Sequence, residues 1–204
     1  MNGVKEPQDA RIPSRGRVAG QQPLCESRRS GRAESHEVDG KCFRVHLEDK
    51  TVVVYGVSDP HGMALTKALS RRRALIFLAD SVPERAESAA RSIIEAGGAA
   101  ESAEVDLSDG REVEDYTSGV AQWTGGVDVA VVAVGGDHAV TQLTAARVAA
   151  SHMAARGRGL IVVTSVRASS ERRLRHLAQR VAPRGVTVLP VFCGYDAYQS
   201  AVLP

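Results

Sequence analysis

The chain has 204 residues, of which 43% are hydrophobic and 25% are charged, and its formal net charge is only +2. This length allows one globular domain and a tail. The small net charge gives no ground for a nucleic-acid or membrane partner, and we expect neither. No stretch approaches the ~20 apolar residues of a membrane span, and the N-terminus lacks the apolar core of a secretory signal. We therefore expect a cytoplasmic protein.

The first part of the chain differs from the rest. Residues 1–46 are rich in Arg, Ser, Gly and Gln and show no apolar period, which predicts a disordered polar tail. The three cysteines, Cys25, Cys42 and Cys193, are far apart and form no CxxC pair. This spacing predicts reduced thiols, and we expect no metal site.

From residue 47 onward, short β-branched runs alternate with longer alanine-rich segments. Strands are predicted at 51–55, 74–79, 103–105, 127–134, 160–165 and 186–192. Helices are predicted between them at 62–72, 84–96, 110–123, 139–155 and 170–182. Strands that are apolar almost throughout are typical of a parallel sheet buried on both faces. Residues 47–204 are therefore predicted to form an α/β domain, a Rossmann-like doubly wound parallel sheet of about six strands with helices on both faces.

The first predicted strand leads into the turn YGVSDPHG at residues 55–62. A dinucleotide-binding turn needs three glycines and, about 20 residues further on, an acidic residue for the ribose hydroxyls. Gly56 and Gly62 hold the outer glycine positions, and Asp80 ends the second strand. Pro60 takes the middle position, where it removes a backbone donor and adds a ring. The helix after the turn would still offer free amides to an anion.

Three features near this turn have alternative interpretations. Asp80 either binds ribose or caps the following helix. His61 either contacts phosphate or faces water. The arginines at 71–73 either complement the helix dipole or bind a 2′-phosphate. The cofactor could therefore be NADP as well as NAD.

Segments from Lys50 to Gly194 resemble, in order and spacing, the short-chain dehydrogenase/reductase family. The turn YGVSDPHG stands where that family has TGxxxGxG. The segment VDLSD at 105–109 follows, then VAVG at 132–135, and RGRGLIVVTSV resembles the strand that carries the catalytic serine. LAQRVAPRGVTVLPVFCG at 177–194 resembles the helix and strand before the family's PG turn.

The resemblance implies an NAD(P)-dependent oxidoreductase acting on a small carbonyl or alcohol substrate. It implies cofactor contacts from Gly56, Ser58, His61, Gly62, Asp80, Asp106, Leu107 and Gly135. Within this set Asp106 would bind the adenine, and Asp80 favours NAD over NADP. Ser165 would be the catalytic serine.

The sequence departs from the family at the acid–base pair. Family members use YxxxK, in which the lysine lowers the pKa of the tyrosine so that the phenol can act near neutral pH. No lysine follows Lys67, and the gap between Ser165 and the strand at 186 is too short for the usual loop and long helix. The sequence given stops at Pro204 without a counterpart of the family's last helix and strand. We therefore expect a truncated and divergent member.

Two tyrosines, Tyr195 and Tyr198, follow the last predicted strand at the edge where ligands gather in open α/β sheets. Ser165 with Tyr195 would be the minimal catalytic pair, although a phenol without a cationic neighbour keeps a pKa near ~10. Two classes of function therefore stay open. One is an oxidoreductase with an atypical site, and the other is a catalytically inactive nucleotide-binding or scaffold protein. The resemblance implies pairing through the fourth and fifth helices, and the helix at 139–155 keeps an apolar stripe, so we expect a homodimer.

Overall fold

The structure is a computed structural model that describes residues 47–57, 59–134, 138–166 and 168–192. The chain divides into two units, Met1–Arg44 and Val45–Pro204, and everything described below belongs to the second. The predicted polar tail lies outside the described residues.

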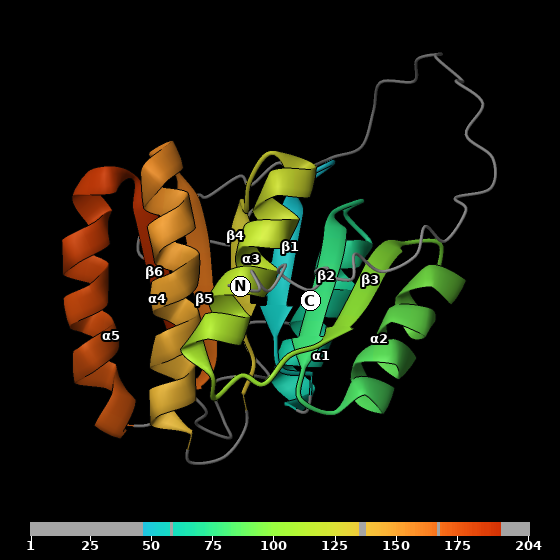
Figure 1. Cartoon of the computed structure of the whole chain (residues 1–204), viewed down its shortest axis with the longest axis horizontal. Coiled ribbons are helices and arrows are strands. Elements are labelled where there is room, and N and C mark those ends of the chain that lie inside the picture. Colours follow the sequence, from blue (N-terminus) through green and yellow to red (C-terminus); the bar gives the residue numbers. More distant parts are fainter. Residues whose placement is uncertain (1–46, 58, 135–137, 167, 193–204) are drawn as a thin grey trace, which may run out of the picture. The chain divides into compact units, whose positions relative to one another are not determined.

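Strands and helices alternate along the second unit, as the sequence pattern predicts (Figure 1). The elements are β1 (Thr51–Tyr55), α1 (Pro60–Ser70), β2 (Leu75–Asp80), α2 (Pro83–Glu95), β3 (Ala99–Glu104), α3 (Gly110–Thr124), β4 (Val129–Val132), α4 (Ala139–Arg156), β5 (Gly159–Val166), α5 (Ala168–Val181), a short 3₁₀ helix (Ala182–Arg184) and β6 (Val186–Phe192).

The strands form one parallel sheet in the order β3-β2-β1-β4-β5-β6. The chain therefore leaves β1 toward one edge of the sheet and resumes on the other side of β1 at β4. In open sheets of this kind, ligands bind outside the carboxyl ends of the strands at such a switch point. The predicted fold class is confirmed. A ligand site is expected between the carboxyl ends of β1 and β4.

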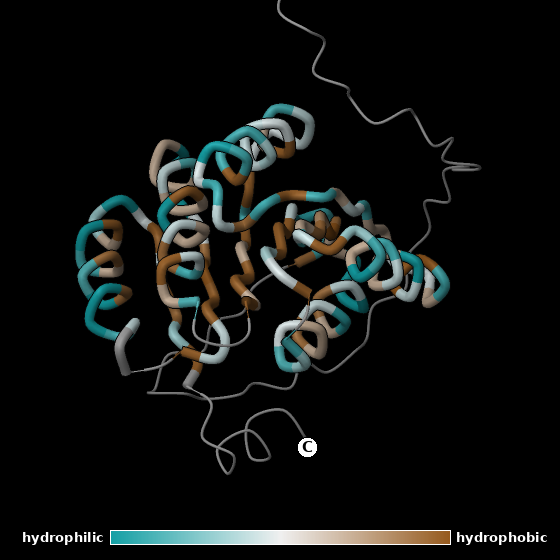
Figure 2. Tube along the Cα trace, turned by 60° about the horizontal axis from the view of Figure 1, so that its bottom comes forward, coloured by the Kyte–Doolittle hydropathy of each residue, from teal (hydrophilic) through white to brown (hydrophobic). Residues whose placement is uncertain are grey.

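Helices cover both faces of the sheet, and the alternation of side chains along β1 shows how. Val53 and Tyr55 belong to a core cluster with apolar residues of α3, α4 and α5. Val52 and Val54 belong to a second cluster with residues of α1 and α2. In Figure 2 the hydrophobic segments gather along the strands and the inward sides of the helices. The sheet is therefore buried on both faces.

The α4 stripe that indicated a homodimer faces this core. Ala145, Ala146, Ala149, Ala150 and Met153 are all buried in the cluster that α4 shares with the sheet. These side chains are therefore used inside the domain, and the homodimer stays a prediction that this stripe does not support.

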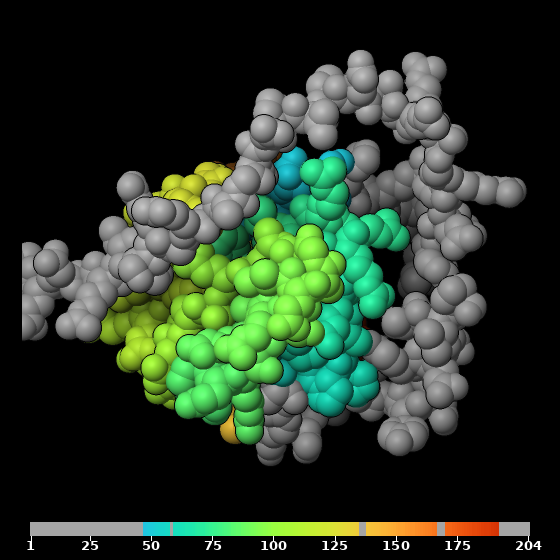
Figure 3. Space-filling view, turned by 90° about the vertical axis from the view of Figure 1, so that its right-hand side faces the viewer, coloured from blue at the N-terminus to red at the C-terminus, as the bar shows by residue number. Residues whose placement is uncertain are grey.

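Several boundaries differ from the sequence prediction by one or more residues, and two of these differences have a clear physical reason. Helix α1 begins at Pro60, two residues early, because proline suits the first helical position and Asp59 caps it. Strand β3 begins at Ala99 and not at 103, because its segment AAESAE is an edge strand with half-exposed polar residues and lacks an apolar run. Figure 3 shows this edge of the domain, where green atoms of α2 and β3 lie at the surface.

Candidate functional site

The turn after β1 needs glycine at both of its outer positions. Gly56 has φ of +84°, and a Cβ there would lie 2.9 Å from the carbonyl oxygen of Ala133. A Cβ on Gly62 would lie 2.0 Å from the Cβ of Ala133, because α1 passes directly against the end of β4. The tight turn and the close helix packing of a dinucleotide-binding fold are therefore both present.

Asp59 occupies the start of α1. It is the N-cap residue, and its Oδ1 accepts a hydrogen bond of 3.2 Å from the backbone N–H of His61. Pro60, at the first helical position, has no N–H to offer. The anion position at this helix N-terminus is therefore taken by the chain's own carboxylate.

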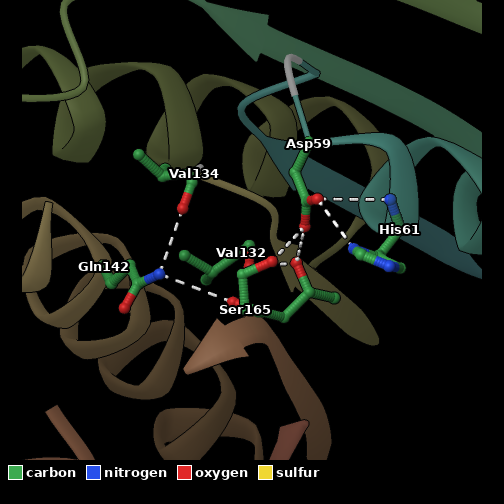
Figure 4. A network of polar contacts seen from close by, with 7 residues as sticks. Asp59, His61, Val132, Val134, Gln142 and Ser165 are labelled. Carbon is green, nitrogen blue, oxygen red and sulfur yellow. Dashed lines mark hydrogen bonds and ion pairs between the residues drawn. The ribbon is translucent and has the colours of Figure 1, made fainter. Parts of the chain in front are cut away.

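The same carboxylate connects the turn to β5. Asp59 Oδ2 accepts hydrogen bonds from Thr164 Oγ1 at 2.7 Å and from Ser165 Oγ at 2.9 Å. The ring Nδ1 of His61 lies 3.1 Å from Asp59 Oδ1. Figure 4 shows the carboxylate between His61 on one side and Ser165 on the other. Only 4% of Asp59 is exposed, whereas His61 and Ser165 are half-buried, so the carboxylate is shielded from water more than these two partners are.

The charge state of Asp59 follows from these partners. Burial by itself would raise the pKa of the carboxyl, but the hydrogen bonds from Thr164, Ser165 and His61 outweigh burial and hold the pKa below its ordinary value. Asp59 is therefore a carboxylate at neutral pH.

Ser165 lies in β5, where the pairing with β6 shifts register between Val163 and Val166. Its φ is +56°, a left-handed conformation that costs energy in a residue other than glycine. Strained residues of this kind cluster at functional sites. The structure thus places this predicted catalytic residue in β5, the strand beside β4, and its hydroxyl donates to Asp59 at the start of α1.

Gln142 of α4 fixes the ends of two strands behind Ser165. This side chain is buried, and its Nε2 donates to the carbonyl oxygens of Val134 at 3.0 Å and Thr164 at 3.4 Å. Figure 4 shows this amide between the two strand ends. Gln142 therefore holds the backbone that positions Ser165.

Asp80 ends β2 with both carboxylate oxygens engaged. Oδ2 accepts the backbone N–H of Val57 at 2.7 Å, and Oδ1 accepts that of Val82 at 2.9 Å. The first bond holds the glycine turn and the second holds the loop before α2. Asp80 is 3% exposed, but the N-cap of α2 is Val82, so the expectation that Asp80 caps this helix is wrong. Ribose binding stays a prediction.

Asp106 lies beyond β3 on the surface. Its Oδ1 accepts from the backbone N–H and the hydroxyl of Ser108, and these bonds lower its pKa. It borders an open depression of about 460 Å³ together with Ser81, Glu104 and Glu112. The neighbouring Leu107 is buried in the core. The adenosine side of the predicted site is therefore acidic and open.

Other predicted contributors fall elsewhere. Ser58, Gly135 and Tyr195 lie outside the described residues. The arginines at 71–73 directly precede β2, and Arg73 pairs with Glu48 at 3.0 Å. They therefore stand at the amino end of the strand, opposite Asp80, and the interpretation of this triplet as a 2′-phosphate site is wrong.

The tyrosines of the described part do not supply a general base. Tyr55 and Tyr116 are desolvated by burial, which raises the pKa of each phenol. Tyr55 shares a hydrogen bond of 2.7 Å with Thr117 on the α3 side of the sheet. Residues 168–185, which connect β5 to β6, contain neither tyrosine nor lysine. The YxxxK pair is therefore absent from this connection.

Asp59, Thr164 and Gln142 were missed as site residues by sequence reasoning. A signal existed for Asp59, because Asp directly before a proline at the first helical position is a helix start. None existed for Thr164 or Gln142, whose roles depend on which strands are neighbours. Within the described ranges no three His, Cys, Asp or Glu side chains are grouped to hold a metal ion. No helix found there has the length and apolarity needed to cross a membrane.

Fold and glycine turn together define a protein of the Rossmann-like α/β class. Residues 50–148, just under half of the chain, match the family model for short chain dehydrogenases. The predicted resemblance to the short-chain dehydrogenase/reductase family is confirmed over these residues. No curated protein matches the chain.

Several solved structures share the fold. A metagenomic short-chain oxidoreductase in complex with NADP is 24% identical, with a TM-score of 0.65 over 74% of this chain and 84% of that one. A 7α-hydroxysteroid dehydrogenase complexed with NADH and 7-oxo glycochenodeoxycholic acid is 17% identical, with a TM-score of 0.66 over 78% and 77%. An NAD⁺-bound xylitol dehydrogenase is 20% identical, with a TM-score of 0.66 over 73% and 71%. At these identities the likeness shows the fold alone.

Proposed function

We propose that this domain binds an adenine dinucleotide, NAD in preference to NADP, and does not carry out hydride transfer by the tyrosine–lysine route of its family. The glycine turn at Gly56 and Gly62 supports the binding, and the absence of tyrosine and lysine from the connection between β5 and β6 carries the statement on hydride transfer. When bound, NAD supplies or accepts a hydride, but that chemistry also needs a group that moves a proton. The described site offers no such phenol near neutral pH.

The two halves of a dinucleotide fit this site unequally. On the adenosine side, Gly56 keeps the open turn, and Asp106 lies at the acidic depression. On the pyrophosphate side, Pro60 lacks an N–H, and the carboxylate of Asp59 holds the helix N-terminus. The adenosine side is therefore open to a ligand, whereas the residues at the pyrophosphate side fit an anion poorly, so no reaction step is assigned to the cofactor.

The preference for NAD rests on charge. Glu104, Asp106 and Glu112 line the depression, and the arginines that would suit a 2′-phosphate stand at the opposite edge. An added phosphate beside three carboxylates meets like-charge repulsion. NADP should therefore bind more weakly than NAD.

A second function is favoured by the geometry of Ser165. Its strained backbone is typical of catalytic positions. An oxidoreductase that uses Ser165 with Tyr195 on a carbonyl or alcohol substrate would fit this feature and the family.

Thermal unfolding with NAD, NADP and adenosine at about 1 mM and above tests binding, because a ligand of the native state raises the midpoint. We expect a rise with NAD and adenosine and a smaller one with NADP. No rise with any of them contradicts the proposal.

Nicotinamide absorbance with a panel of carbonyls and alcohols then separates the two functions. The binding function predicts no turnover. Turnover that Ser165→Ala abolishes would instead establish the oxidoreductase.

A further inference from the structure

The proposed function leaves one polar cluster, built around the buried Asp59, without a role. It joins Asp59 and His61 at the start of α1 to Thr164 and Ser165 in β5. A carboxylate that is 4% exposed is costly to bury unless its oxygens are hydrogen-bonded, and here both oxygens are. The cluster is therefore a defined contact between turn and strand.

The position of this carboxylate has a chemical consequence. The N-terminus of a helix attracts anions through its unpaired amides and its dipole. In α1 the amide of His61 donates to Asp59 Oδ1, and Pro60 has no amide hydrogen. The carboxylate of Asp59 thus accepts a hydrogen bond from the N-terminus of α1 in the way that a bound phosphate would.

The partners from β5 stabilise the negative form. Thr164 Oγ1 and Ser165 Oγ both donate to Asp59 Oδ2, so two neutral donors hold an ionised acceptor. A pyrophosphate brought to this turn would meet the fixed negative charge of Asp59, which is itself 4% exposed, and like charges repel. An uncharged ligand would not meet this repulsion.

We propose that Asp59 is a specificity-determining residue, whose carboxylate takes the anion position at the start of α1 and discriminates against pyrophosphate in favour of uncharged adenosine. This inference rests on the proposed binding of an adenine dinucleotide. The inference adds that the carboxylate of Asp59 weakens the binding of the dinucleotide.

Titration calorimetry of the full chain with adenosine, ADP and NAD tests the inference. Asp59→Ser removes the charge but keeps a residue that caps helices well. Asp59→Asn is a second variant in case one of the two folds poorly. For either variant we expect ADP and NAD to bind about tenfold more tightly or better, because the like charge is gone. Adenosine should bind as it does to the wild type.

Asp109→Ser is the matched control. Asp109 is the N-cap of α3, its carboxylate accepts the backbone N–H of Arg111 at 2.8 Å, and it is exposed. This change also removes one carboxylate from the start of a helix that follows the carboxyl end of a strand, but here water screens the charge. We expect the affinity for NAD to change by no more than about twofold.

The outcomes separate this inference from the proposed function. If the wild type binds NAD or adenosine and the Asp59 variants do not tighten NAD and ADP, the inference is overturned and the binding function stands. If adenosine tightens as much as ADP, the effect is not one of charge, and the inference is also overturned. If no protein binds any of the three ligands, the proposed function fails and the inference fails with it.

Discussion

Asp59 illustrates how much one residue decides at this site. It caps α1, orients the turn and holds Ser165 through a hydrogen bond of 2.9 Å. Gly62 acts nearby through the lack of a side chain, since α1 approaches β4 too closely for a Cβ. Asp59 acts through its charge, and Gly62 acts by leaving room for close packing. Substitution of Asp59 should therefore change stability in a pH-dependent way, whereas substitution of Gly62 should change it through a steric clash.

Gly62→Ala should destabilise the domain by about 1–3 kcal/mol, because the new Cβ would lie 2.0 Å from the Cβ of Ala133. The matched control is Gly119→Ala in α3, where a Cβ would meet nothing within 4 Å. That change should stabilise by up to ~1 kcal/mol, because alanine favours a helix interior more than glycine. Urea unfolding measures both, and equal effects of the two changes would contradict the close packing of α1.

Asp59→Asn should lower the free energy of unfolding at pH 7 by about 2 kcal/mol, through the loss of charged hydrogen bonds and a cap. The pKa of Asp59 is lowered from its ordinary value of 3.8. Its stabilising effect is therefore fully present above 3.8 and is lost as the pH falls through the folded-state pKa. The difference in the free energy of unfolding between the wild type and Asp59→Asn should therefore become smaller as the pH falls below about 4.

Urea unfolding over a series of pH values measures that difference. The exposed cap variant Asp109→Asn serves as the control, with an expected cost of at most about 1 kcal/mol. A difference that stays constant from neutral to acidic pH would contradict an ionised Asp59 held by the cluster.

At the scale of elements, the site depends on how strand ends are held together. Helix α4 begins after β4, and its Gln142 bridges the carbonyl oxygens of Val134 and Thr164. Thr164 then contacts Asp59 at the start of α1. Elements from the middle and the end of the domain are thus connected to the first turn through a few buried polar groups.

Gln142→Leu keeps the approximate volume of the side chain but leaves the carbonyl oxygens of Val134 and Thr164 without this donor. Unpaired buried acceptors cost about 1–3 kcal/mol, and we expect a loss of that size in urea unfolding. Ser151→Ala, an exposed change on the same helix, should stay within about 0.5 kcal/mol. A stable Gln142→Leu variant would show that the amide does not hold the strand ends.

At the scale of the whole molecule, the sheet and its covering helices lie in the unit Val45–Pro204. Deletion of residues 1–44 should therefore leave the cooperative unfolding of the domain unchanged. Urea titration compares the midpoints and slopes of the full and shortened chains. A clear fall in the midpoint would show that the first unit contributes to the stability of the second.

Much of this architecture could be predicted from local patterns. The runs of β-branched residues marked five of the strands, because buried parallel strands are apolar almost throughout. Edge strand β3 was placed only at its end, since half-exposed polar residues give no such signal. The roles of Gly56 and Gly62 were also predictable, because they depend on the turn that their own spacing defines.

The sequence by itself determined the fold class, the family resemblance and the absence of YxxxK between β5 and β6, because each depends on residues close together in the chain. Only the tertiary structure decided that Asp59 pairs with Ser165, 106 positions away, and that the arginines before β2 stand at the edge opposite Asp80. Such contacts depend on strand order and on the directions of the strands. Local propensity does not encode either, since both arise when the sheet assembles around a shared core.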